Sequence, residues 1–98
     1  MQGTIEQYQF VDWFQKHRPN NFTYKGSIAL FEYLEQLEWE TGEEMEFDPI
    51  AFCCEYSEYA TINECLEQYD NIESIDELRD NTSVIEVQGT DAIIIQNF

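Results

Sequence analysis

Charge is the feature that most restricts what this chain can fold into. The sequence holds 21 acidic residues against four Lys and Arg, a formal net charge of −17 on 98 residues. Like charges repel one another and destabilise a compact state, so a folded form must keep its carboxylates in solvent. The excess is uneven, since residues 1–26 have a net charge of +1 and residues 27–98 hold 19 acidic residues against Arg79 alone. We therefore expect the charge to serve binding, with solubility alone as the simpler alternative.

The apolar content predicts a folded domain and not an acidic tail. Hydrophobic residues make up 43% of the chain and aromatic residues 15%, whereas disordered acidic segments are poor in aromatics. The length fits one small domain over residues 1–98. We see no secretion signal, no long apolar run and no CxxC pair among Cys53, Cys54 and Cys65. These features predict reduced thiols, one buried and one half-buried at positions 53 and 54, in a cytoplasmic protein.

Helical spacing of apolar residues predicts two helices in the first half, over residues 7–17 and 27–41. We expect Pro19 to stop the first helix, Ser27 to cap the second at its N-terminus and Gly42 to end it. The expected buried stripe of the second helix consists of Leu30, Phe31, Leu34 and Leu37.

The second half predicts the sheet. Residues 50–54 form a short apolar run, which we interpret as a buried strand, and residues 55–59 are expected to be its exit loop. The remaining expected elements are helices from Thr61 to about Tyr69 and from Ser74 to about Asp80, each opened by a capping box, and strands over 84–88 and 92–96 around Gly89. The predicted fold is α+β, with a small three-stranded antiparallel sheet and helices packed mainly on one face.

No pattern of catalytic or metal-binding residues stands out. His17 is the only histidine, and its neighbours Lys16 and Arg18 favour a surface position without a catalytic partner. Nucleotide-binding and zinc motifs are absent, and the acidic segment 43–48 lacks the pattern of a calcium loop. We expect no catalytic residue, no metal and no cofactor. A small hydrolase that uses paired carboxylates is kept as an alternative.

The charge density is close to that of DNA. Seventeen charges correspond to roughly 29 Å of duplex, about the expected diameter of the domain. Such a chain should be steered to a basic groove built for nucleic acid, and should bind neither nucleic acid nor membrane itself. Helical rotation also places Trp39 on the solvent face of the second helix among carboxylates. The predicted partner-binding residues are Glu32, Glu35, Trp39, Glu40, Glu43, Glu44, Glu46, Glu55 and Glu58.

One segment resembles a known family. Residues 47–59 read Phe-Asp-Pro-Ile-Ala-Phe-Cys-Cys-Glu-Tyr-Ser-Glu-Tyr. They are similar to the motif Phe-Asp-x-Ile-Ala-x-Cys-Cys-Glu-Tyr-x-Glu-Tyr of small acidic proteins from phages and mobile elements, as are residues 29–35 and 93–98 to its acidic helix and C-terminal hairpin. Pro49 departs from the pattern, where an apolar β-branched residue is expected. The resemblance implies an inhibitor of the anti-CRISPR or anti-restriction kind, some of which are DNA mimics, acting in the host bacterial cytoplasm.

Two classes of function therefore remain open at this point beside the hydrolase. The first is a non-enzymatic inhibitor that occupies the basic nucleic-acid-binding surface of a bacterial defence complex, a CRISPR effector above all, and blocks target DNA. The second is a regulatory adaptor that binds a basic protein through its acidic and aromatic residues. A homodimer could form through an uncovered edge at residues 92–95.

Overall fold

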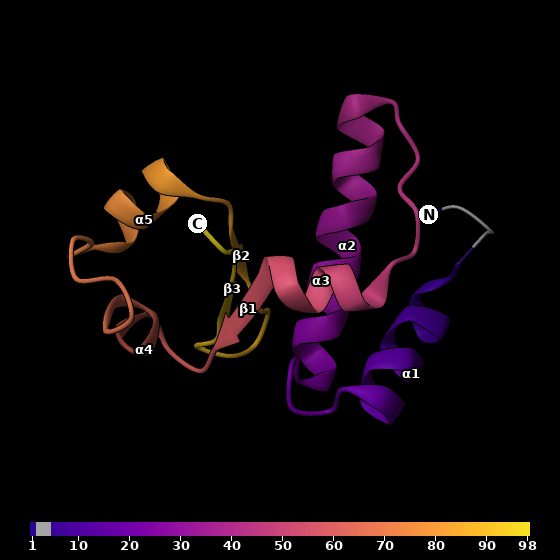
Figure 1. The fold of residues 1–98 in the computed structure, drawn as a ribbon, viewed down its shortest axis with the longest axis horizontal. Helices are drawn as coiled ribbons and strands as arrows, with labels where there is room; N and C mark the ends of the chain where they lie inside the picture. The colour runs from indigo at the N-terminus through magenta and orange to yellow at the C-terminus, as the bar shows by residue number, and fades with distance from the viewer. Residues whose placement is uncertain (2–4) are drawn as a thin grey trace.

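The structure is a computed structural model that describes Met1 and residues 5–98. The elements in chain order are α1 (Gln7–His17), α2 (Tyr24–Thr41), α3 (Pro49–Glu55), β1 (Tyr56–Tyr59), α4 (Ile62–Leu66), α5 (Ile75–Asn81), β2 (Val84–Glu86) and β3 (Ile93–Gln96). They form the α+β fold predicted from the sequence, with an antiparallel sheet in the order β1-β3-β2 (Figure 1). No helix in this described part of the chain is both long and apolar enough to cross a membrane.

The central strand β3 divides the interior into two clusters. Ile94 belongs to the larger cluster, which holds most of the buried apolar side chains of α1 and α2. Ile93 and Ile95 belong to a smaller one with Cys65 of α4 and Leu78 of α5. The alternation follows from the strand, because successive side chains point to opposite faces of a sheet. Figure 1 shows α1 and α2 on one side of the sheet and the two short helices α4 and α5 on the other.

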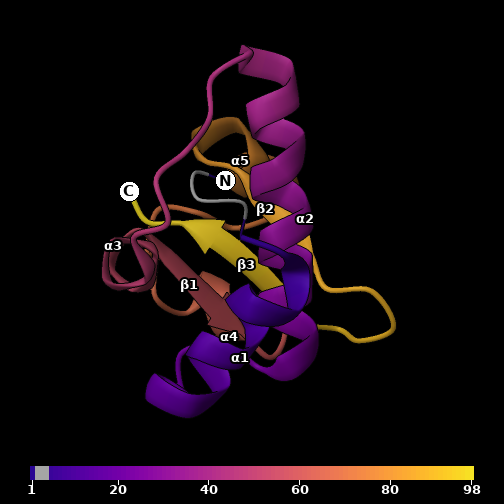
Figure 2. The same ribbon diagram turned by 90° about the vertical axis from the view of Figure 1, so that its right-hand side faces the viewer.

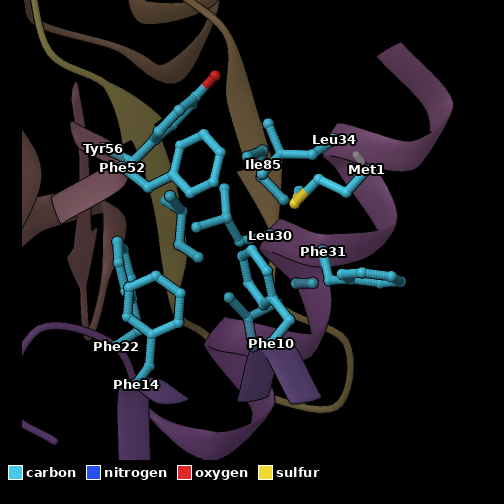
Figure 3. Packing of buried hydrophobic residues seen from close by; sticks show 13 residues of the cluster. Met1, Phe10, Phe14, Phe22, Leu30, Phe31, Leu34, Phe52, Tyr56 and Ile85 are labelled. Atoms are coloured by element: carbon cyan, nitrogen blue, oxygen red, sulfur yellow. The ribbon is translucent and has the colours of Figure 1, made fainter. Parts of the chain in front are cut away.

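Aromatic rings fill the larger cluster. Phe10 lies at the centre of this packing. Its ring centroid is 5.0 Å from that of Phe14 and 5.2 Å from that of Phe31. Phe22 packs edge-on against Phe14, so the turn between the first two helices is held to the core (Figure 3). The predicted stripe of α2 is buried at Leu30, Phe31 and Leu34, but Leu37 is only half-buried because the last turns of the helix extend past the sheet.

Two predictions for residues 50–59 were wrong. The apolar run 50–54 lies in helix α3, whose N-cap Asp48 accepts a hydrogen bond from the backbone N–H of Ala51 at 3.2 Å. Pro49 stands at the first position of this helix, where its missing N–H has no cost. Residues 56–59, expected as a loop, form edge strand β1, and Tyr56 pairs with Gln96 of β3. Cys53 is half-buried and Cys54 exposed on the helix, and neither is buried on a strand.

The edge expected at residues 92–95 is not open to a second copy, because β3 is the central strand and pairs with β1 on one side and β2 on the other. The remaining boundaries differ in smaller ways. The bounds of α1 and the end of α2 at Gly42, whose φ is 73°, agree with the prediction. However, α2 begins three residues before Ser27, because the hydroxyl of Thr23 accepts a hydrogen bond from the N–H of Gly26 at 2.9 Å. Ser27 is buried and donates to the carbonyl of Tyr24. Helix α4 begins as expected but ends at Leu66, earlier than predicted.

Candidate protein-binding surface

Carboxylates gather where α2 ends. Figures 1 and 2 show the C-terminal end of this helix projecting beyond the other elements, with the segment 42–48 returning beside it to α3. We call five of the carboxylates of this region the acidic end: Glu35, Glu40, Glu43, Glu44 and Glu46. Four of them are exposed, and the side chain of Glu35 is partly exposed, at 42%. The local fold thus presents them to solvent on a projecting part of the surface.

The position of these charges is unfavourable for the helix. The last four carbonyls of an α-helix lack intrahelical partners and carry a partial negative charge, which cations stabilise and anions destabilise. The last turn of α2 contains no basic residue, and Glu40 and Glu43 lie beside its end. We therefore expect carboxylates at this point to destabilise the protein, so stability does not account for their position.

One carboxylate of the region has an internal role. Glu38 accepts hydrogen bonds from the backbone N–H of Met45 at 2.6 Å and from the Met1 ammonium at 3.1 Å. Partial burial acts to raise the pKa of Glu38, but the hydrogen bond from Met45 and the ammonium of Met1 together hold that pKa below its ordinary value. Glu38 therefore holds the segment after α2 against the helix and fixes the position of the acidic end.

Trp39 lies beside these carboxylates, with 82% of its surface exposed. It flanks a shallow hollow lined also by Met1, Glu35, Glu38, Gly42, Glu43 and Glu44. Most tryptophans bury a large apolar area, so an indole this exposed is a candidate contact residue. The structure thus brings together the predicted site residues Glu35, Trp39, Glu43 and Glu44, with Glu40 and Glu46 close to them along the chain.

Three predicted site residues lie elsewhere. Glu32 stands on the middle of α2, where it borders a groove with Lys25 and Ile85. Glu55 is exposed at the end of α3. Glu58, on β1, accepts hydrogen bonds from the backbone N–H and the hydroxyl of Thr23 at 2.9 and 2.8 Å. Its carboxylate is therefore already occupied at the N-terminus of α2.

The sequence prediction omitted a second acidic region. The acidic residues of the segment that contains α4 and α5 are Glu64, Glu67, Asp70, Glu73, Asp76, Glu77 and Asp80, and all are exposed. Arg79, the basic residue of this segment, pairs with Glu86 at 2.9 Å. The high density of acidic residues between positions 64 and 80 is the sequence feature that indicates this region. This region lies on the other side of the sheet from α2 (Figure 1).

Three of the four basic residues stand at the opposite end of α2. Lys16 lies in the last turn of α1, Arg18 caps that helix and Lys25 lies in the first turn of α2. The 18 residues of α2 span about 27 Å at the helical rise, which separates these cations from the acidic end. The uneven charge of the sequence therefore places positive charge at the start of α2 and negative charge at its end.

Other chemistry is sparse in the described residues. His17 is exposed, and its ring centroid lies 4.8 Å from that of Trp13. Within Met1 and residues 5–98, no three His, Cys, Asp or Glu side chains are arranged as a group that could hold a metal ion. All three cysteines are free thiols.

No family model, curated protein or solved structure matches this chain. The resemblance of residues 47–59 to small acidic phage proteins therefore stays a prediction. The fold and the distribution of charge are what a functional proposal can rest on.

Proposed function

We propose that the protein is a non-enzymatic inhibitor in the bacterial cytoplasm that binds the basic nucleic-acid-binding surface of a CRISPR effector complex and blocks target DNA. The observation that supports this most is the acidic end, a set of carboxylates on a projecting helix end where they cost stability. A function in binding explains that cost, because sites that serve function are often unfavourable for folding.

The carboxylates of the acidic end are available to a partner. Among the described residues, the ion pairs that involve acidic side chains are Arg79 with Glu86 and the Met1 ammonium with Glu35 and Glu38. The Met1 ammonium lies 3.9 Å from Glu35 and much closer to Glu38, so Glu35 keeps most of its capacity to bind. Charge-assisted hydrogen bonds to Lys and Arg of a partner would satisfy these groups.

The net charge per unit length of the molecule approaches that of duplex DNA. The longest axis of the molecule is 40 Å, and a duplex of that length carries about 24 charges. The net charge of −17 reaches about 70% of that value. Long-range attraction to a groove evolved for nucleic acid should therefore be strong at low ionic strength and fall as salt screens it.

Two charge-reversal variants test the proposal. The first, E40K/E43K/E44K/E46K, changes the acidic end, and the matched control, E67K/D70K/E73K/D80K, makes the same change in net charge beside α4 and α5. Each would be titrated against purified CRISPR effectors in a gel-shift assay of target DNA binding. We expect the wild-type protein and the control to block DNA binding and the first variant to lose inhibition. Full inhibition by the first variant would contradict a role for the acidic end.

The exposed indole of Trp39 supports a second candidate function, the adaptor that binds a basic protein unrelated to nucleic acid. Duplex DNA should displace the inhibitor from its target, because both would occupy one surface, but it should not displace an adaptor. A competition experiment with a captured partner after nuclease treatment separates the two functions.

A further inference from the structure

The surroundings of Trp39 fit one kind of side chain better than others. The described aromatic rings that pack against one another do not include Trp39, so both faces of its indole are free of aromatic neighbours. With 82% of its surface exposed, the indole is open to a ligand. An aromatic face attracts cations through its quadrupole, and Trp does so more strongly than Tyr or Phe.

The hollow beside the indole supplies acceptors for such a cation. Glu43 and Glu44 line it and are exposed, and Glu35 lines it from the preceding turn of α2. Glu38 does not compete for the ligand, because Met1 and Met45 already occupy its oxygens. The hollow thus combines a free aromatic face with carboxylates that lack a cationic side chain of this chain's own.

Arginine and lysine are not equivalent at such a place. A guanidinium is planar, so it can stack on the indole while its N–H groups donate to carboxylates at the edge of the ring. A lysine ammonium is a compact, strongly hydrated charge that cannot do both at once. The combination of an exposed tryptophan with carboxylates on one side therefore favours arginine.

We propose that the Trp39 hollow receives an arginine side chain of the basic partner, with the guanidinium stacked on the indole and hydrogen-bonded to the carboxylates beside it. This inference rests on the proposed function and adds to it the residue type that the partner supplies. It makes Trp39 the central contact of the interface and the surrounding carboxylates its rim, an arrangement common in protein interfaces.

The test uses octa-arginine and octa-lysine peptides as probes, titrated by calorimetry against the full chain at low salt. The variant W39L removes the indole, and Y24L is the matched control, since Tyr24 is 62% exposed but stands next to Lys25. We expect the wild-type protein and Y24L to prefer the arginine peptide by about two- to fivefold, and W39L to bind both peptides alike. In a W13F background, in which Trp39 is the remaining tryptophan, the arginine peptide should also change the fluorescence of the indole.

The outcomes separate this inference from the proposed function. If W39L keeps the preference for arginine, the hollow is not an arginine site, although charge-driven binding stands. If neither peptide binds the wild-type protein, the acidic end does not attract basic partners, and both ideas fall. If both peptides bind and E40K/E43K/E44K/E46K removes the preference for arginine as W39L does, the carboxylates beside the indole select the guanidinium as proposed. If the preference persists in that variant, Glu43 and Glu44 do not bind the guanidinium, and the inference fails.

Discussion

The carboxylate of Glu58 binds Thr23, the N-cap residue of α2. It accepts hydrogen bonds from both the backbone N–H and the hydroxyl of Thr23. The same hydroxyl accepts from the N–H of Gly26, so a strand residue stabilises a helix whose N-cap lies 35 positions earlier in the chain. Negative charge at a helix N-terminus is favourable, because the first N–H groups lack intrahelical partners. Glu58 thus contributes to the joint between the sheet and the longest helix.

Gly26 and Glu58 should be energetically coupled. A Cβ at position 26 would lie 1.9 Å from the Oε1 atom of Glu58, so alanine must displace the carboxylate from Thr23. We expect G26A to lower the free energy of unfolding in the wild-type background, because two hydrogen bonds worth about 1 kcal/mol each are lost. In an E58A background the same substitution should raise it, by up to about 1 kcal/mol, through helix propensity. Urea denaturation of the four proteins measures the coupling, and additive effects would contradict it.

Glu38 should make stability depend on acid pH. Its pKa is lowered in the folded state, so its contribution is present above the unfolded pKa of about 4.3 and is lost as the pH falls through the lower folded value. We expect E38Q to lower the free energy of unfolding at neutral pH by about 1–3 kcal/mol, the cost of a broken charged hydrogen bond.

The difference between E38Q and wild type should shrink below about pH 4. E40Q is the matched control on the same helix, since the hydrogen bond recorded for Glu40 is an exposed one from Gln36 at 3.3 Å. Chemical denaturation at several pH values measures both variants. An equal effect of the two substitutions would show that Glu38 does not fasten the segment after α2.

Charge reversal at the acidic end should stabilise the fold. In E40K/E43K/E44K/E46K, cations replace anions beside the C-terminal carbonyls of α2, and the net negative charge falls. We expect the midpoint of thermal unfolding to rise, with a gain of about 1 kcal/mol at low salt. The gain should decrease in high salt, because exposed charges are screened within about 8–10 Å at physiological ionic strength. A loss of stability would mean that these carboxylates have structural partners.

The three thiols should react in a defined order. Cys54 is exposed, Cys53 is half-buried and Cys65 is fully buried. Burial raises the pKa of Cys65, and it also raises the pKa of Cys53, against the opposing charge of Arg18. Because the thiolate is the reactive form, we expect iodoacetamide to modify Cys54 first, Cys53 more slowly and Cys65 only on unfolding. Mass spectrometry over time gives the order, and equal rates in urea are the control.

Local signals predicted the helices better than they predicted the sheet. The bounds of α1 and the end of α2 depend on apolar spacing and on Gly42, which adopts a positive φ. The pair Asp48 and Pro49 is also a local signal for a helix, an N-cap followed by proline at the first helical position, but the apolar run after it equally fits a strand. Short apolar runs do not distinguish a strand from a helix by periodicity alone.

Strand β1 could not be found by local reasoning. Its residues pair with β3, and Tyr56 and Gln96 are 40 positions apart. Asn97 also joins this corner, because its side chain donates to the carbonyl of Cys54 and accepts from the hydroxyl of Ser57. Likewise, no pattern near Glu58 indicates that its carboxylate is bonded to Thr23. The exposure of Trp39, in contrast, follows from rotation along one helix and was predictable.

The position of β3 has a consequence for the order in which this protein can form during synthesis. The strand that pairs with both neighbours and contributes to both clusters, β3, follows both of those neighbours in the chain. Until residues 93–96 leave the ribosome, β1 and β2 lack their shared partner, and each cluster lacks an isoleucine of that strand. The sheet and the two clusters can therefore be completed only after residues 93–96 have been synthesised. During that interval, we expect mutual repulsion among its many carboxylates to oppose aggregation of the exposed apolar segments.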